Sequence, residues 1–148
     1  MEMLESLFRL YAAHCDARWW IGPRPDGPAD SVPRAIAAHI GYPTARHDPF
    51  VPPGLLTLNF QQVAYVLAVA GTVGLAYGFR APRSDDFKSA ALALNALGSN
   101  RNFVANGLWS ADADGSMEWT ALSSATFDCG LIGFDRDHAF TFWVEEED

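Results

Sequence analysis

The sequence lacks the cysteine and histidine patterns that mark disulfide-rich and metal-binding proteins. It has two cysteines in 148 residues, Cys15 and Cys129, far apart in the chain. Small oxidised domains usually carry more pairs, so we expect two free thiols in a reducing, cytoplasmic compartment. The four histidines form no His-x-x-x-His pair, and no Cys-x-x-Cys pair occurs. The sequence therefore predicts no metal site and no cofactor.

A membrane-spanning segment and a targeting segment are also missing. The one candidate for a membrane span, residues 63–79, contains three glycines. It falls short of the roughly 20 residues that a spanning helix needs. The first residues, Met-Glu-Met-Leu-Glu, are acidic where a signal sequence would be basic. We therefore expect no membrane association and place residues 63–79 in a buried core.

Catalytic and nucleotide-binding signatures are absent as well. The chain has no Gly-x-Ser-x-Gly, no P-loop and no dinucleotide fingerprint. Residues 112–115 begin like a calcium loop, but the twelfth position would be Ser123 instead of glutamate, and we interpret them as a β-turn. His14 and Cys15 suggest a Cys–His couple, but adjacent residues on a helix point in different directions.

Basic residues are scarce in the last third of the chain. Residues 1–100 contain eight acids and eight bases, whereas residues 101–148 contain ten acids against Arg101 and Arg136. The whole net charge of −8 therefore comes from the last third. Such a charge repels nucleic acid and attracts basic proteins. We expect a basic protein partner and no nucleic-acid partner.

Helical patterns dominate the first two-thirds of the sequence. The apolar spacing predicts four helices there, over residues 3–18, 31–40, 60–70 and 84–97. Asn59 and Gln62 have the spacing of a capping box at the start of the third helix, and Gly71 would end it. Residues 72–80 alternate large and small side chains, which predicts a strand. The alternative for this region is two strands in place of a helix and a strand.

Strand patterns dominate the last third. Strands are predicted over residues 103–109 and 117–122, and residues 124–148 have the pattern of a β-hairpin with a polar break at residues 135–138. In its second strand, Phe140, Phe142 and Val144 share one face, and Thr141, Trp143 and Glu145 share the other. The sequence thus predicts a single α+β domain over residues 1–148. Its N-terminal helices pack on a mainly antiparallel sheet that ends in a C-terminal β-hairpin.

The hairpin and the acidic tail supply the candidate partner-binding residues. These are Asp128, Asp135, Asp137, His138, Trp143, Glu145, Glu146, Glu147 and Asp148. An aromatic side chain beside carboxylates, as at Trp143, is a frequent hot-spot composition at interfaces. The tail carboxylates are expected to steer a basic partner toward the protein. As exposed charges, they are expected to add little stability.

A short, acidic, single-domain chain without a catalytic motif resembles, in general type, the bacterial immunity and antitoxin proteins that plug a toxin's active site. The resemblance implies a non-catalytic cytoplasmic protein that neutralises a basic, nuclease-like toxin, and it assigns no residue roles. The alternative is a small hydrolase or transferase that uses Asp128, Asp135, Asp137 or His138. A homodimer joined through the C-terminal strand is compatible with either function.

Overall fold

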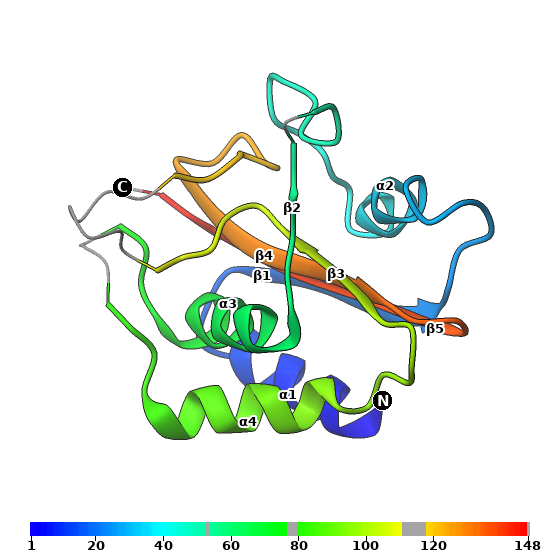
Figure 1. Cartoon of the computed structure of the whole chain (residues 1–148). Helices are drawn as coiled ribbons and strands as arrows, with labels where there is room; N and C mark the ends of the chain where they lie inside the picture. Colours follow the sequence, from blue (N-terminus) through cyan, green and yellow to red (C-terminus); the bar gives the residue numbers. More distant parts are fainter. Residues whose placement is uncertain (53, 77–79, 111–117, 148) are drawn as a thin grey trace.

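A five-stranded antiparallel sheet lies at the centre of the part of the chain that the structure describes, residues 1–52, 54–76, 80–110 and 118–147 (Figure 1). The structure is a computed structural model. The strands are β1 Ala17–Pro23, β2 Leu56–Thr57, β3 Asn102–Ala105, β4 Phe127–Phe134 and β5 His138–Glu146. Their order across the sheet is β1-β5-β4-β3-β2. The predicted C-terminal hairpin, β4 and β5, therefore lies inside the sheet.

Helices cover both faces of this sheet. They are α1 Glu2–Ala12, α2 Val32–Ala38, α3 Phe60–Thr72 and α4 Ser84–Leu94. Helices α1, α3 and α4 lie on one side, and α2 lies on the other (Figure 1). The predicted α+β class, with helices in the N-terminal part and a C-terminal hairpin, is confirmed. None of the helices in the described ranges combines the length and the apolar character that a membrane span requires.

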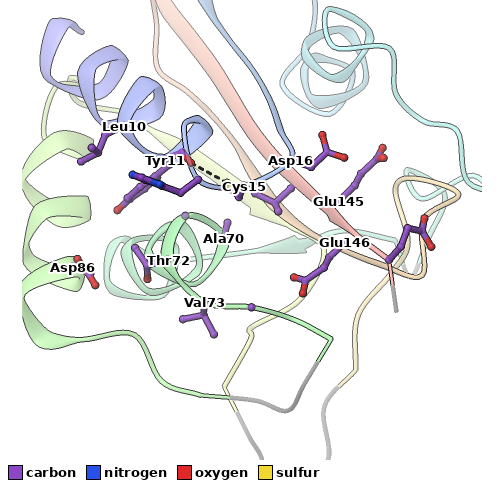
Figure 2. Close-up of a pocket in the computed structure, with 15 residues that line it drawn as sticks. Leu10, Tyr11, Cys15, Asp16, Ala70, Thr72, Val73, Asp86, Glu145 and Glu146 are labelled. Atoms are coloured by element: carbon purple, nitrogen blue, oxygen red, sulfur yellow. Dashed lines mark hydrogen bonds between the residues drawn. The ribbon is translucent and has the colours of Figure 1, made fainter.

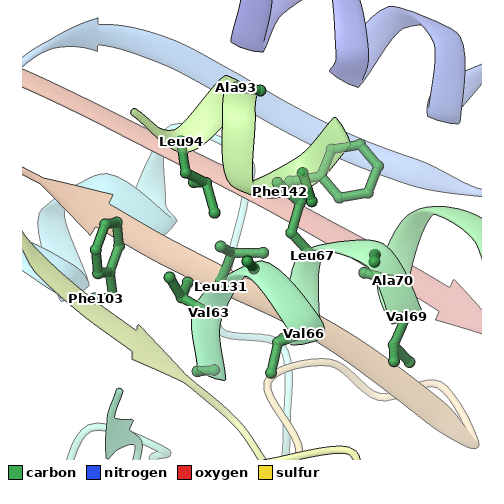
Figure 3. Packing of buried hydrophobic residues seen from close by; sticks show 14 of the residues in the cluster. Val63, Val66, Leu67, Val69, Ala70, Ala93, Leu94, Phe103, Leu131 and Phe142 are labelled. Atoms are coloured by element: carbon green, nitrogen blue, oxygen red, sulfur yellow. The ribbon is translucent and has the colours of Figure 1, made fainter. Parts of the chain in front are cut away.

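The alternation predicted for β5 places its side chains in two separate cores. Phe140, Phe142 and Val144 pack in the core under α1, α3 and α4. Figure 3 shows side chains of α3, α4 and the strands meeting there, among them Leu67, Leu94 and Phe142. Trp143 belongs to the second core, under α2. Because both faces are covered, β5 carries a nearly continuous run of buried residues.

The predicted capping box is present and begins α3. The Asn59 side chain accepts a hydrogen bond from the Gln62 backbone N–H at 2.8 Å, and the Gln62 side chain accepts one from the Asn59 N–H at 2.9 Å. Helix α3 then continues through Gly71 to Thr72. The two-strand alternative for this region is wrong. The predicted strand over residues 72–80 is also wrong at residues 72–76, and residues 77–79 lie outside the described part.

Other element boundaries differ from the sequence prediction. Helix α1 ends at Ala12, and residues 17–23 form the edge strand β1 instead of continuing the helix to residue 18. The reason is tertiary, because β1 pairs with β5 along its whole length. The strand predicted over residues 103–109 shortens to β3. In the region predicted as a strand over residues 117–122, Trp119 makes one bridge to Gly107. The β-turn predicted at residues 112–115 lies outside the described residues.

Strand β5 has no free edge for a second copy of the chain. It pairs with β1 on one side and with β4 on the other. The outer strands of the sheet are β1 and β2. Residues 138–144 of β5 therefore offer no free edge for the strand-to-strand homodimer that the sequence allowed.

Gly71 allows a close approach of α1 to α3 instead of ending the helix. A Cβ atom at this position would lie 2.1 Å from Cδ2 of the Tyr11 ring. We expect Gly71→Ala to lower the free energy of unfolding by about 1–3 kcal/mol, because overpacking against a buried ring outweighs the higher helix propensity of alanine. Urea unfolding measures the change.

Gly74→Ala is the matched control for this prediction. A Cβ there has its nearest neighbour, Glu146 Oε1, at 3.7 Å. This variant should therefore stay within about 0.5 kcal/mol of the wild type. Equal stability of the two variants would contradict the assignment of Gly71 to the helix contact.

Candidate functional site

The structure divides the predicted partner-binding residues among three places. Asp128 and Trp143 are interior, Asp135, Asp137 and His138 lie at the β4–β5 turn, and Glu145, Glu146 and Glu147 lie at the other end of β5. Asp148 lies outside the described residues. Strand β5 has nine residues, so its ends are about 26 Å apart. The turn and the tail are thus two separate groups of carboxylates.

Asp128 is a fully buried carboxylate at the centre of a hydrogen-bond network. Its Oδ1 accepts hydrogen bonds from Trp143 Nε1 at 2.8 Å and from the Leu122 backbone N–H at 3.0 Å. The Asn106 side chain also donates to Oδ1, and the backbone N–H and the hydroxyl of Ser123 donate to Oδ2. All of these donors are neutral. Burial raises the pKa of Asp128, and the hydrogen bonds from Trp143, Leu122 and Ser123 lower it only in part.

The same network explains the position of Trp143. Its side chain is 0% exposed, and the Tyr42 ring packs edge-on against it at a centroid distance of 6.3 Å. The alternation in the sequence correctly placed Trp143 on the face of β5 opposite to Phe140. We expected that opposite face to be open to a partner. Helix α2 and Tyr42 cover that face. In this fold, Trp143 and Asp128 hold the segment at residues 122–123 against the sheet.

We expect Asp128→Ala to destabilise the protein strongly. The substitution leaves Trp143 Nε1 and the N–H groups of the 122–123 segment without their acceptor, which costs about 3 kcal/mol or more. Urea unfolding, followed by tryptophan fluorescence, measures the loss. Asp26→Ala, in an exposed loop, is the control and should change stability by less than about 0.5 kcal/mol. Similar stability of the two variants would contradict the role given to Asp128.

Asp135 organises the β4–β5 turn. It is 5% exposed, and its carboxylate accepts backbone hydrogen bonds from Gly98 at 2.7 Å, Asp137 at 2.8 Å and His138 at 2.7 Å. Burial alone would raise the pKa of Asp135, but these three N–H donors outweigh it and lower the pKa. Asp137 and His138 are exposed beside it.

The residues named for a hydrolase or transferase lie in two places. Asp128 and Asp135 are seven positions apart on or next to β4, which places them about 23 Å from each other. Asp135, Asp137 and His138 do meet, beside a hollow of about 400 Å³. His138 Nδ1 lies 3.4 Å from Asp135 Oδ1. However, the Asp135 oxygens already accept the three N–H groups that shape the turn.

The lowered pKa of Asp135 predicts a pH-dependent contribution to stability. We expect Asp135→Asn to lower the free energy of unfolding by about 1–2 kcal/mol at pH 7. Since the folded pKa lies below the unfolded value of about 3.9, this contribution is present above that value and is lost as the pH falls through the folded pKa. The gap to the wild type should therefore narrow below pH 4. Urea unfolding at pH 7 and pH 3 measures this difference in the free energy of unfolding, with the exposed Asp137→Asn as the control. A difference that does not change with pH, or one equal to that of the control, would contradict the prediction.

A pocket of about 870 Å³ lies at the other end of β5, between the ends of α1 and α3 and the start of α4 (Figure 2). Its described lining includes five carboxylates and no lysine or arginine. The carboxylates are Asp16, Asp86, Glu145, Glu146 and Glu147. Figure 2 shows Asp86 on the opposite side of the pocket from Glu145 and Glu146. We call this site the acidic pocket.

The tail carboxylates are held in place by the fold. Glu145 accepts a hydrogen bond from the Tyr42 hydroxyl and lies 3.6 Å from Arg18 Nη2. Glu146 accepts the backbone N–H groups of Leu75 at 2.7 Å and Ala76 at 3.2 Å. Both side chains are half-buried. The expectation that these tail acids are merely exposed charges is therefore wrong for Glu145 and Glu146, which also fix neighbouring segments.

Comparison with protein-family models, curated proteins and solved structures finds no match. The function must therefore be argued from the acidic pocket itself. Within the described ranges, no group of three or more histidine, cysteine, aspartate or glutamate side chains could hold a metal ion.

His14, Cys15 and Asp16 line the pocket from the turn between α1 and β1. The Cys15 thiol donates a hydrogen bond to the Tyr11 carbonyl at 3.1 Å. Burial raises the pKa of Cys15, and the charges of Asp16 and Glu146 raise it further. The thiol is thus kept protonated, which is the opposite of an activated nucleophile. The structure describes both cysteines as free thiols.

Sequence reasoning missed Asp16 and Asp86 as partners of the tail. Both come from the first 100 residues, where acids and bases balance. The apolar spacing of the sequence also predicted a helix as far as residue 18, so it did not place Asp16 in the turn between α1 and β1, where it lines the pocket. A signal that ends the helix before Asp16 would have been needed to find Asp16.

Proposed function

We propose that this protein is a non-catalytic binding protein of the immunity or antitoxin type, which acts in the cytoplasm. It binds a basic partner protein at the acidic pocket. The observation that carries the proposal is a concave site whose described lining contains five acidic residues and no lysine or arginine. Three of them come from the tail, and Asp16 and Asp86 come from distant parts of the chain.

Concave acidic sites favour cationic partners for two reasons. Like charges around a hollow focus the electric field and attract basic groups before contact, which raises the association rate. A cation that enters the hollow also relieves the mutual repulsion of the carboxylates. A nuclease-like toxin has the complementary surface, because the groove that binds nucleic-acid phosphates is basic.

The pocket carboxylates divide into two groups by their exposure. Asp16 and Glu147 are exposed at the rim, whereas Asp86, Glu145 and Glu146 are half-buried. Rim charges mainly govern the rate of encounter, and buried contacts mainly govern the rate of dissociation. The partner's contacts are therefore expected at the pocket residues instead of at Asp128 and Trp143, which are buried.

The proposal predicts that removing pocket charge slows binding of the basic partner. We expect the triple variant Asp16→Asn, Asp86→Asn, Glu147→Gln to associate about tenfold more slowly at low salt. The difference should shrink at high salt because ions screen exposed charges. Surface plasmon resonance against the toxin-like product of a neighbouring gene, at two salt concentrations, measures both effects.

A control variant with the same change in net charge tests whether position matters. Asp26, Asp30 and Asp137 are exposed and do not line the acidic pocket. Their replacement by asparagine should leave the association rate nearly unchanged. The proposal fails if the control slows binding as much as the pocket variant, or if no basic protein is bound at low salt.

A further inference from the structure

The acidic pocket contains a buried hydroxyl that has no hydrogen-bond partner in the described part of the protein. It belongs to Tyr11, whose side chain is 4% exposed and lines the pocket. Figure 2 shows the Tyr11 ring directed from α1 toward the side of the pocket where Asp86 and Thr72 lie. Burying an unpaired hydroxyl is unfavourable, and native proteins rarely leave one so. This observation is independent of the carboxylates and indicates a ligand group at the same place.

The surroundings of Tyr11 define the chemistry of that ligand. Burial, and after it the charge of Asp86, raises the pKa of Tyr11 to about 12, so the hydroxyl stays protonated near neutral pH. A neutral hydroxyl both donates and accepts, and its oxygen can accept a hydrogen bond from a cationic N–H group. Apolar side chains, among them Leu10, Val73 and Val144, form part of the wall. The pocket thus combines acceptors on separate sides with an apolar lining.

We infer that the acidic pocket binds the guanidinium group of an arginine side chain of the basic partner, with the Tyr11 hydroxyl as one of its hydrogen-bond acceptors. This inference rests on the proposed function. A guanidinium group is planar and carries five N–H donors that point in different directions. It can therefore reach carboxylates on opposite walls, such as Asp86 and Glu146. It is also more weakly hydrated than an ammonium group, which lowers the cost of entering a partly apolar pocket.

The experiment is an NMR titration of the full chain with three small probes: N-acetyl-arginine amide, its lysine counterpart and its neutral citrulline counterpart. The arginine probe should shift the backbone amide signals of Gly71, Gly74 and Glu146, which line the pocket. Citrulline has nearly the same shape without the charge and should bind at least about tenfold more weakly. The lysine probe should also bind more weakly than the arginine probe.

Two pairs of variants test the residues. Tyr11→Phe removes only the hydroxyl and should weaken arginine binding about tenfold, whereas Tyr65→Phe, outside the pocket, should not. Asp86→Asn should weaken binding, whereas Asp85→Asn, its exposed neighbour in the first turn of α4, should not. Because Tyr11→Phe removes an unpaired polar atom, its urea midpoint should be unchanged or higher. Loss of binding therefore cannot be ascribed to unfolding.

Equal binding of arginine and citrulline, equal binding of arginine and lysine, or unchanged binding by Tyr11→Phe would each overturn the inference. Its failure is distinguishable from failure of the proposed function. A basic partner whose binding is unaffected by Tyr11→Phe and Asp86→Asn would overturn the pocket assignment alone. Arginine binding in the expected pattern, without any basic protein partner, would support the pocket and overturn the proposed function.

Discussion

Strand β5 is paired on both edges and covered on both faces, and the rest of the structure is arranged around that position. Its pairing with β1 brings the segment after α1 into the sheet, and its pairing with β4 forms the hairpin. Its two faces require two separate sets of covering elements, α1, α3 and α4 on one side and α2 on the other. Strand β4 pairs with the end of β5 as far as Glu146 and so places Glu145 and Glu146 relative to the core.

The carboxylates of the C-terminal hairpin and of the acidic pocket lie in three different environments, and they have different physical roles in each. Asp128, surrounded by neutral donors, holds interior segments together, and Asp135 holds the turn through backbone N–H groups. Asp86 and Glu146 instead lie on opposite sides of a hollow. Carboxylates that accept several donors within the fold are structural, and Glu145 and Glu146 share this role in part. The pocket lining as a whole contains no lysine or arginine and so retains capacity for an external cation. This distinction moves the proposed binding site away from the hairpin as a whole and toward one end of it.

The acidic pocket combines features that a simple charged surface lacks. A convex acidic face would attract any basic protein with little selectivity, and salt would screen it. A hollow with an apolar wall and a buried hydroxyl adds shape and hydrogen-bond geometry to the charge. Such a site can discriminate among cations by their shape and hydration. Its carboxylates come from α4, from the turn after α1 and from the end of β5, so it exists only in the folded protein.

Local sequence patterns determined several parts of this structure. The Asn59–Gln62 spacing set the start of α3, because both capping hydrogen bonds form within four residues. The alternation at residues 140–144 fixed which side chains share a face, because strand geometry has a period of two. The composition also located the excess negative charge in the last third.

The tertiary structure decided which elements pack against the residues of these patterns. A period of two says that Trp143 faces away from Phe142, but only the packing of α2 decides that this face is buried. Residues 17–23 became a strand because β5 offered an edge, and the same pairing ended α1 early. Asp16, Asp86 and Glu146 line one pocket because distant segments pack together, and no local spacing encodes this arrangement. The amount of charge was thus set by the sequence, and its placement around one pocket by the fold.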